Sequence, residues 1–239
     1  MAENKRLSGL SWEGPAQVVA RGGFLTLTRR LLRNRYQDGS HSRAYEVESA
    51  LTPFLDAVVL VLFAPPEAAS GRGIRVVLRR SVRPAVAQRA EVPGLLHLDQ
   101  RPWSGAFWEL PAGGVEKSDL EPGGLGLLGR ASQECWEEAG LRVAAEKFFA
   151  LGPSPFSAPA FCPERLHYLC AEVDPGRAQP PPGDGHPMEE GAELRFLELD
   201  EALDWCQQGR ILDGKTELGL RRLEQLLATQ GFPGLTTGV

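Results

Sequence analysis

The sequence is poor in cysteine and has no long apolar run. Its four cysteines, Cys135, Cys162, Cys170 and Cys206, lack the paired C-x-x-C spacing of zinc sites, so we expect reduced thiols and no disulfide framework. No apolar stretch approaches the ~18 residues of a membrane span, and the N-terminus has no signal-peptide core. We therefore expect a cytoplasmic protein with no membrane partner.

Excess positive charge is also missing. The net charge is −5 and the isoelectric point is near 5.5, which argues against a nucleic-acid surface because such surfaces are normally basic. The arginine cluster at residues 29–35 is an exception. We interpret it as a solvated strand edge or turn, with an anion-binding or subunit-binding patch as the alternative.

Three glutamates that lie close together in one segment are the most informative feature of the sequence for function. In a helix, Glu134, Glu137 and Glu138 would share a sector of ~100°, and Gly140 would end the helix. A solvated amphipathic helix is the alternative, but carboxylates this close repel by roughly 1 kcal/mol per pair, which favours a bound hard cation such as Mg²⁺. The neighbouring sector holds the residues expected to face a core: Leu128, Ala131, Cys135 and Ala139.

This segment, Q-E-C-W-E-E-A-G-L, resembles the second half of the Nudix hydrolase box, G-x5-E-x7-R-E-U-x-E-E-x-G-U, where U is a bulky aliphatic residue. Two features depart from the box. Gln133 replaces the arginine that braces the loop in the family, and Gly113 lies 21 residues before Glu134 instead of 15. Glu121 and Arg130 are available to brace the longer loop by another route.

Two upstream segments strengthen the resemblance and imply ligand-binding roles. Residues 108–114, W-E-L-P-A-G-G, resemble the E-L-P-A-G segment of the nucleoside diphosphate sugar branch, and residues 80–86 resemble its "QYR-x-A" segment. The resemblance implies that Arg83 binds a phosphate and that Glu109 contacts the terminal ribose or nucleoside. It also implies that Glu134 and Glu138 are the principal metal ligands, with Glu137 as a further ligand taking part in catalysis and the Ala112 carbonyl as a backbone ligand.

A downstream segment indicates the subfamily. Residues 159–169 resemble the P-G-F-S-x-E-x-x-H-L-F-L segment of ADP-ribose pyrophosphatases, and Pro159 follows Leu141 by 18 residues, as the marker proline of that branch does. The resemblance makes Glu164, expected on a loop over the active site, the leading candidate for the general base. Glu189 and Glu190, on a loop rich in proline and glycine, are the alternative pair.

The implied architecture is an α/β Nudix fold, with a mixed β-sheet sandwiched between helices (α/β/α) and a small N-terminal β arm. Residues 1–52 would form the arm and support a homodimer, with strands expected at 17–20, 24–29 and 42–48. Residues 53–235 would form the Nudix domain, beginning with a buried strand at 57–63. The last helix carries an apolar stripe of Leu218, Leu220, Leu223, Leu226 and Leu227.

The implied activity is Mg²⁺-dependent hydrolysis of the diphosphate linkage of a nucleoside diphosphate sugar, with Mn²⁺ as a possible substitute. ADP-ribose, cleaved to AMP and ribose 5-phosphate, is the first choice. A UDP-sugar such as UDP-glucose is the second, and a non-catalytic Nudix ligand-binding regulator is the third. The residue that stacks on the base stays open among Trp12, Phe24, Tyr45 and Trp103.

Overall fold

The computed structural model describes residues 5–54, 56–67, 71, 73–92, 105–189 and 191–230. Trp103, Glu190 and the expected domain end at residue 235 lie outside these ranges. The chain forms two compact units: residues 1–55 together with 156–165, and residues 56–155 together with 166–239. The short segment 156–165 therefore belongs with the N-terminal unit, although it lies far along the chain.

The N-terminal unit is built on one antiparallel sheet. Its strands are β1 (Leu7–Trp12), β2 (Gln17–Arg21), β3 (Thr26–Tyr36) and β4 (Tyr45–Leu51). The long β3 pairs with all three others. β2, β3 and β4 overlap the three expected strands, whereas β1 was not predicted. In the same unit, β10 (Phe156–Ala158) pairs with the first residues of β11 (Cys162–Glu172).

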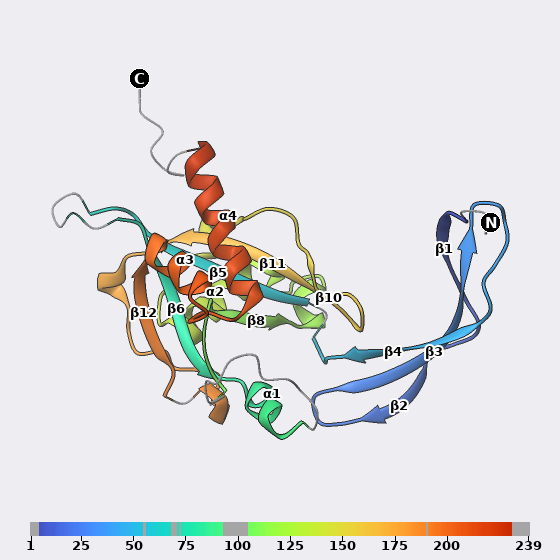
Figure 1. Cartoon of the computed structure of the whole chain (residues 1–239). Coiled ribbons are helices and arrows are strands. Elements are labelled where there is room, and N and C mark those ends of the chain that lie inside the picture. Colours follow the sequence, from blue (N-terminus) through green and yellow to red (C-terminus); the bar gives the residue numbers. More distant parts are fainter. Residues whose placement is uncertain are drawn as a thin grey trace. The chain divides into compact units, whose positions relative to one another are not determined.

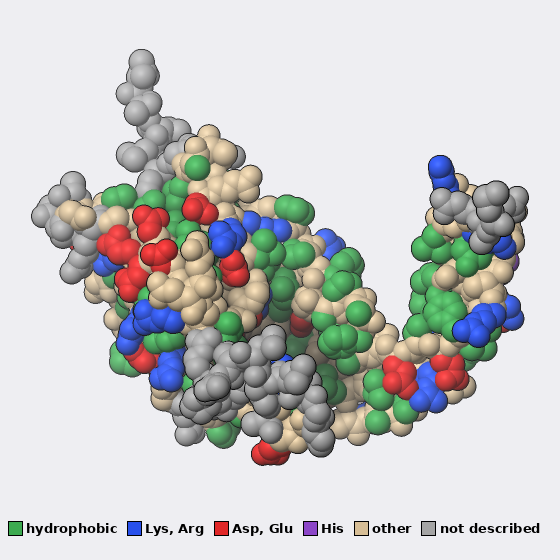
Figure 2. Space-filling model, in the orientation of Figure 1, with side chains coloured by type: hydrophobic (Ala, Val, Ile, Leu, Met, Phe, Trp, Pro, Cys, Tyr) green, Lys and Arg blue, Asp and Glu red, His purple; other side chains and the backbone are tan. Residues whose placement is uncertain are grey.

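The arginine cluster of the N-terminal unit lies within β3. Arg29 forms an ion pair with Glu48 at 2.7 Å, and Arg33 forms one with Glu13 at 2.9 Å. These partners balance part of the local positive charge, as expected for a solvated strand. Figure 2 shows green, apolar patches on this unit. The large apolar side chains that the unit exposes are Leu7, Leu10, Trp12, Val18, Val19, Phe24 and Leu25.

The second unit contains a mixed sheet in the order β11-β5-β6-β12, formed with β5 (Asp56–Ala64), β6 (Arg75–Val82) and β12 (Glu193–Glu198) (Figure 1). β11 runs parallel to β5, and β6 runs antiparallel to both β5 and β12. Three short antiparallel strands complete the sheet: β7 (Ala106–Glu109) pairs with β6, β8 (Ala112–Val115) with β5, and β9 (Phe149–Ala150) with β11.

Helices cover both faces of this sheet. On one face, α2 (Gly126–Ala139) packs its buried residues against alternate residues of β5 in one core cluster. On the other face, α3 (Leu199–Gln207) and α4 (Gly214–Gln230) pack against the remaining β5 residues in a second cluster. The α/β/α prediction is therefore confirmed. The remaining helical segments are short: α1 (Pro84–Ala87), η1 (Gln88–Glu91), η2 (Lys117–Leu120), η3 (Ala145–Lys147), η4 (Pro175–Arg177) and η5 (Pro187–Glu189).

The predicted core faces of the helices are largely confirmed. Ala131, Cys135 and Ala139 are fully buried, and the leucine stripe of α4 packs in the core. The prediction for Leu128 was wrong, because its side chain is 40% exposed and Leu127 packs against the core instead. Residues three and four positions before Ala131 are offset from it by about 60° and 40° around a helix, so Leu127 is nearer the core direction.

Other general expectations concern thiols and surface charge. All four cysteines are free thiols. Among the helices of the described residues, none is both long and apolar enough to cross a membrane. Figure 2 shows acidic side chains gathered over α3, where Asp200, Glu201 and Asp204 are exposed. This surface is negatively charged, whereas binding to the phosphates of a nucleic acid requires a positively charged surface.

Candidate active site

A glycine in β8 makes room for the first glutamate of α2. A Cβ atom placed on Gly113 would lie 1.9 Å from Cδ of Glu134, so the carboxylate of Glu134 occupies space that any other residue at position 113 would fill. α2 ends at Gly140, whose φ of 63° lies in the left-handed region that favours glycine. The two glycines on either side of the glutamates thus fix where the helix stops and where Glu134 lies.

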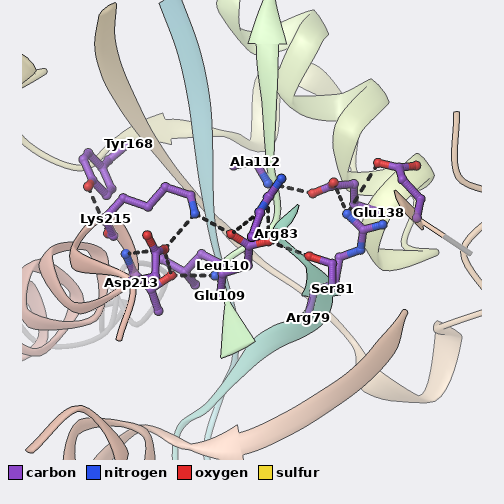
Figure 3. A network of polar contacts seen from close by, with 12 residues as sticks. Arg79, Ser81, Arg83, Glu109, Leu110, Ala112, Glu138, Tyr168, Asp213 and Lys215 are labelled. Atoms are coloured by element: carbon purple, nitrogen blue, oxygen red, sulfur yellow. Dashed lines mark hydrogen bonds and ion pairs between the residues drawn. The ribbon is translucent and has the colours of Figure 1, made fainter. Parts of the chain in front are cut away.

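Glu138 lies deepest in the carboxylate group, with 5% of its surface exposed. Its Oε2 accepts a hydrogen bond of 2.7 Å from the backbone N–H of Ala112, and its Oε1 forms an ion pair with Arg79 of β6 (Figure 3). Burial raises the pKa of Glu138, while the charge of Arg79 and the Ala112 N–H act in the opposite direction. Glu138 therefore connects α2 to β6 and β8.

Glu134 and Glu137 flank this buried carboxylate. Burial, reinforced by the negative charge of Glu137, raises the pKa of Glu134 to about 7. The carboxylate of Glu137 accepts a hydrogen bond of 2.9 Å from the side-chain amide of Gln133. Gln133 thus orients a neighbouring glutamate in its own helix.

Arg130 braces the loop that precedes α2. Its guanidinium binds both carboxylate oxygens of Asp119, with distances of 2.9 and 3.0 Å, and lies 3.7 Å from Glu134. Burial alone would raise the pKa of Asp119, but its hydrogen bonds from Arg130 and from the backbone of Glu116 hold that pKa below its usual value. The brace uses Asp119 and not Glu121, because Asp119 lies inside η2 and is buried.

A second polar network surrounds Glu109 at the end of β7. This carboxylate is 3% exposed and accepts hydrogen bonds from Ser81 at 2.6 Å, from Arg83 at 2.5 Å and from Lys215 at 2.6 Å (Figure 3). Burial alone would raise its pKa, but the charges of Lys215 and Arg83 outweigh burial and lower it. Glu109 is thus an ionised anchor for two cations, and Arg83 keeps 42% of its side chain exposed.

Main-chain hydrogen bonds attach the loop at residues 179–192 to α2. The N–H of Gly183 donates to the Glu137 carbonyl at 2.9 Å, and the N–H of Gln179 donates to the Gly140 carbonyl at 3.0 Å. These bonds bring Glu189 to 3.5 Å from Arg79. A cavity of about 260 Å³ opens between the loop and the sheet, and it is lined in part by Arg79, Glu137 and Glu189.

The structure brings together most of the residues that the sequence singled out. Ala112, Glu134, Glu137 and Glu138 meet at the junction of β8 and α2, as described above. Glu164 lies in β11 within the N-terminal unit, so the expectation that it stands on a loop was wrong: its segment pairs with β10. Trp12, Phe24 and Tyr45 also belong to the N-terminal unit.

Several site residues were missed from the sequence. Arg79 was not singled out because a charged residue inside an apolar strand gives no motif, and only its position two residues after the buried Val77 places it on the α2 side of the sheet. Asp119 was missed because the loop has an unfamiliar length. Lys215 lies in the C-terminal part of the chain, and nothing in the sequence indicated a role for it in the site.

The donor chemistry suits a divalent cation. Glu134, Glu137 and Glu138 offer carboxylate oxygens, the ligands that Mg²⁺ prefers, and Gly113 leaves space for one of them. Within the described residues, no three or more aspartate, glutamate, histidine or cysteine side chains are arranged to hold a metal ion. Glu138 is engaged instead by Arg79 and the Ala112 N–H. The residues therefore suit a metal ion by chemical type, while their described side chains, one of them held by Arg79, are not arranged around one.

The comparisons with known proteins bear on the fold. No protein-family model matches the chain, and a search of curated proteins also finds no match. A solved crystal structure of an ADP compounds hydrolase matches with a TM-score of 0.64 and 15% sequence identity, over 95% of this chain and 99% of that one. Together with the layers described above, this similarity shows that the chain adopts the α/β/α Nudix fold.

Proposed function

We propose that this protein hydrolyses the diphosphate linkage of a nucleoside diphosphate sugar. The observation that carries the proposal is the placement of the Glu134 carboxylate in the space left by Gly113, beside the buried Glu138. ADP-ribose, cleaved to AMP and ribose 5-phosphate, is the first candidate substrate. It is supported by the segment around Pro159 and by the fold shared with an ADP compounds hydrolase.

The proposed cofactor is Mg²⁺, with Mn²⁺ as a substitute, held by Glu134 and Glu138 with help from Glu137 and the Ala112 carbonyl. When bound, such an ion neutralises the anionic oxygens of a diphosphate and so lowers the barrier to attack by water. Arg130 would keep Glu134 in place from the side of the loop. Gln133 would hold Glu137 by its amide.

Arg83 is the proposed phosphate-binding residue. Its guanidinium is anchored on Glu109 and is still partly exposed, so it can present further N–H donors to a phosphate oxygen. Because Glu109 is buried among Ser81, Arg83 and Lys215, we propose that it contributes to binding by positioning these donors. A direct contact of Glu109 with the ribose or nucleoside stays a prediction.

Two glutamates are candidates for the general base. Glu164 is the one implied by the resemblance, and it lies in the N-terminal unit. Glu189 is the alternative, because it lines the cavity of about 260 Å³ together with Glu137. E164Q and E189Q, each assayed for kcat over a range of pH, would identify the base: removing it should lower kcat by about 100-fold or more and abolish the acidic limb of the profile.

The N-terminal unit is proposed to support a homodimer. This unit exposes several large apolar side chains, among them Trp12, Val18 and Phe24, which a second chain would cover. Sedimentation equilibrium on the full chain would test this. A monomer at micromolar concentration would contradict the proposal.

A non-catalytic ligand-binding role is the second candidate function. It is favoured by Arg79, which holds Glu138, and by Gln133, which departs from the box arginine. UDP-glucose is the alternative substrate. The long insertion after residues 83–86 resembles UDP-sugar pyrophosphatases, and so does the unusual box, with Gln133 before Glu134 and the run at residues 136–138 after it.

One experiment distinguishes the hydrolase from the non-catalytic binder and identifies the substrate. Monophosphate release would be measured from ADP-ribose, UDP-glucose, GDP-mannose, NADH and diadenosine polyphosphates, first with Mg²⁺ and then with EDTA. We expect metal-dependent cleavage of one sugar nucleotide well above the rest, and loss of this cleavage in E138Q. Ligand binding without turnover of any compound would instead establish a non-catalytic binder.

A further inference from the structure

Arg79 is a buried positive charge inside a group of carboxylates. Its side chain is 3% exposed, it forms an ion pair with Glu138, and it lies 3.5 Å from Glu189. Its Nε atom is buried without a hydrogen-bond partner among the described residues. Burying an incompletely bonded guanidinium is costly, so the position requires a compensating interaction, and the carboxylates supply it.

The Arg79 guanidinium occupies the position next to Glu138 that a metal ion bound by this carboxylate would occupy. Glu138 is a proposed metal ligand, yet its Oε1 is taken by Arg79 and its Oε2 by the Ala112 N–H. A divalent cation on Glu138 would stand within a few ångströms of the guanidinium, and like charges at that distance in a poorly solvated site repel strongly. The guanidinium and the metal ion therefore compete for Glu138.

The structure also offers Arg79 a second position. The cavity of about 260 Å³ beneath the loop is lined by Arg79, Glu137 and Glu189. Glu189 lies at its edge as a second carboxylate partner, with one oxygen accepting the backbone N–H of Asp184 at 2.8 Å. A guanidinium that leaves Glu138 thus keeps a negatively charged partner nearby.

We propose that Arg79 is an internal cation that holds Glu138 until a divalent metal ion displaces it toward Glu189. The inference rests on the proposed metal site of Glu134 and Glu138. It adds that Arg79 weakens metal binding and so sets the metal concentration at which the site fills.

The test is direct binding of Mn²⁺ to the full chain without substrate, followed by electron paramagnetic resonance of the free ion. R79Q removes the competing charge, and we expect it to bind Mn²⁺ about tenfold more tightly or better. R79K retains the charge and should resemble the wild type. R75Q is the matched control, because Arg75 lies in the same strand, is 8% exposed and pairs with Glu67; its Mn²⁺ affinity should be unchanged.

A double-mutant cycle tests the second position. In the wild-type background, E189Q leaves Arg79 with Glu138 alone, so Mn²⁺ binding should weaken. In the R79Q background, E189Q should have a smaller effect, because only the direct action of the Glu189 charge on Glu134 and Glu138 then remains. A loss as large in R79Q as in the wild type would overturn the displacement toward Glu189.

The outcomes separate this inference from the metal site itself. If neither the wild type nor any variant binds Mn²⁺, the proposed metal site is refuted, and the inference about Arg79 is refuted with it. If Mn²⁺ binds the wild type and R79Q equally well, the metal site stands and the role of Arg79 is overturned. Should R79Q fail to fold, a crystal structure of the wild type with Mn²⁺ decides: we expect Arg79 to have left Glu138, and an intact Arg79–Glu138 pair beside a Mn²⁺ ion on Glu138 would refute the proposal.

Discussion

Replacing Gly113 with alanine should damage metal binding while leaving the fold intact. The new Cβ would lie 1.9 Å from Cδ of Glu134, whereas ordinary contacts begin near 3.4 Å, so the carboxylate must retreat by about 1.5 Å (3.4 − 1.9). A misplacement of about 1 Å in an active site can cost 100-fold in rate, so hydrolysis should fall by about that factor or more.

The cost in stability should be small for two reasons. The displaced group is the end of a flexible side chain, and Gly113 does not have a positive φ, so alanine is allowed there. We expect the free energy of unfolding of G113A to change by less than about 1 kcal/mol. G124A is the contrasting variant, because its Cβ would meet the backbone oxygen of Ser118 at 2.1 Å, and it should lower stability instead.

The assays are Mn²⁺ binding, hydrolysis of the best substrate and denaturant unfolding in EDTA. If G113A binds Mn²⁺ and turns over substrate within about threefold of the wild type, then Glu134 does not depend on the space at Gly113, and the reasoning about this residue is refuted.

Three further predictions concern the charge networks. D119A removes the two-point partner of the buried Arg130 and leaves it only the longer contacts with Glu116 and Glu134, so it should cost up to about 3 kcal/mol of unfolding free energy, as measured with denaturant. Because the pKa of Asp119 is lowered on folding, this deficit relative to the wild type should be full at neutral pH and shrink below about pH 4; a constant deficit would contradict it. K215M should raise the pKa of Glu109, because Lys215 is the largest charge holding it down, and a carbon NMR titration of the carboxyl groups would detect the change. In EDTA, the unfolding free energy of the wild type relative to E134Q should fall as the pH rises from 4.5 to about 7, because the raised pKa of Glu134 lets the folded state hold the extra proton in that window; a constant difference between the two proteins would show that Glu134 titrates normally.

Much of helix α2 was predictable because its signals are local. The spacing of Glu134, Glu137 and Glu138 follows from helical geometry, and Gly140 marks the helix end in the sequence as it does in the structure. The layered fold was equally accessible, since the apolar run of β5 is buried on both faces.

Contacts between distant segments were not predictable in the same way. Arg79 and Glu138 are 59 residues apart, and Glu109 and Lys215 are 106 apart, so no periodic pattern connects them. Residues 156–165 group with the N-terminal unit and contact it through bonds such as the one from the Ala50 N–H to the Phe161 carbonyl at 2.8 Å, between residues far apart in the sequence. In β1, Gly9 interrupts a short strand and weakens its local signal.

The main-chain bonds that join the loop at residues 179–192 to α2 bear on how this site could change. Both bonds, from Gly183 to Glu137 and from Gln179 to Gly140, use backbone atoms alone. Apart from the glycines with positive φ and Glu189, side chains along the loop can therefore be exchanged without losing these two hydrogen bonds. An engineer seeking a new substrate preference would have a region to diversify whose anchorage does not depend on the residues being varied.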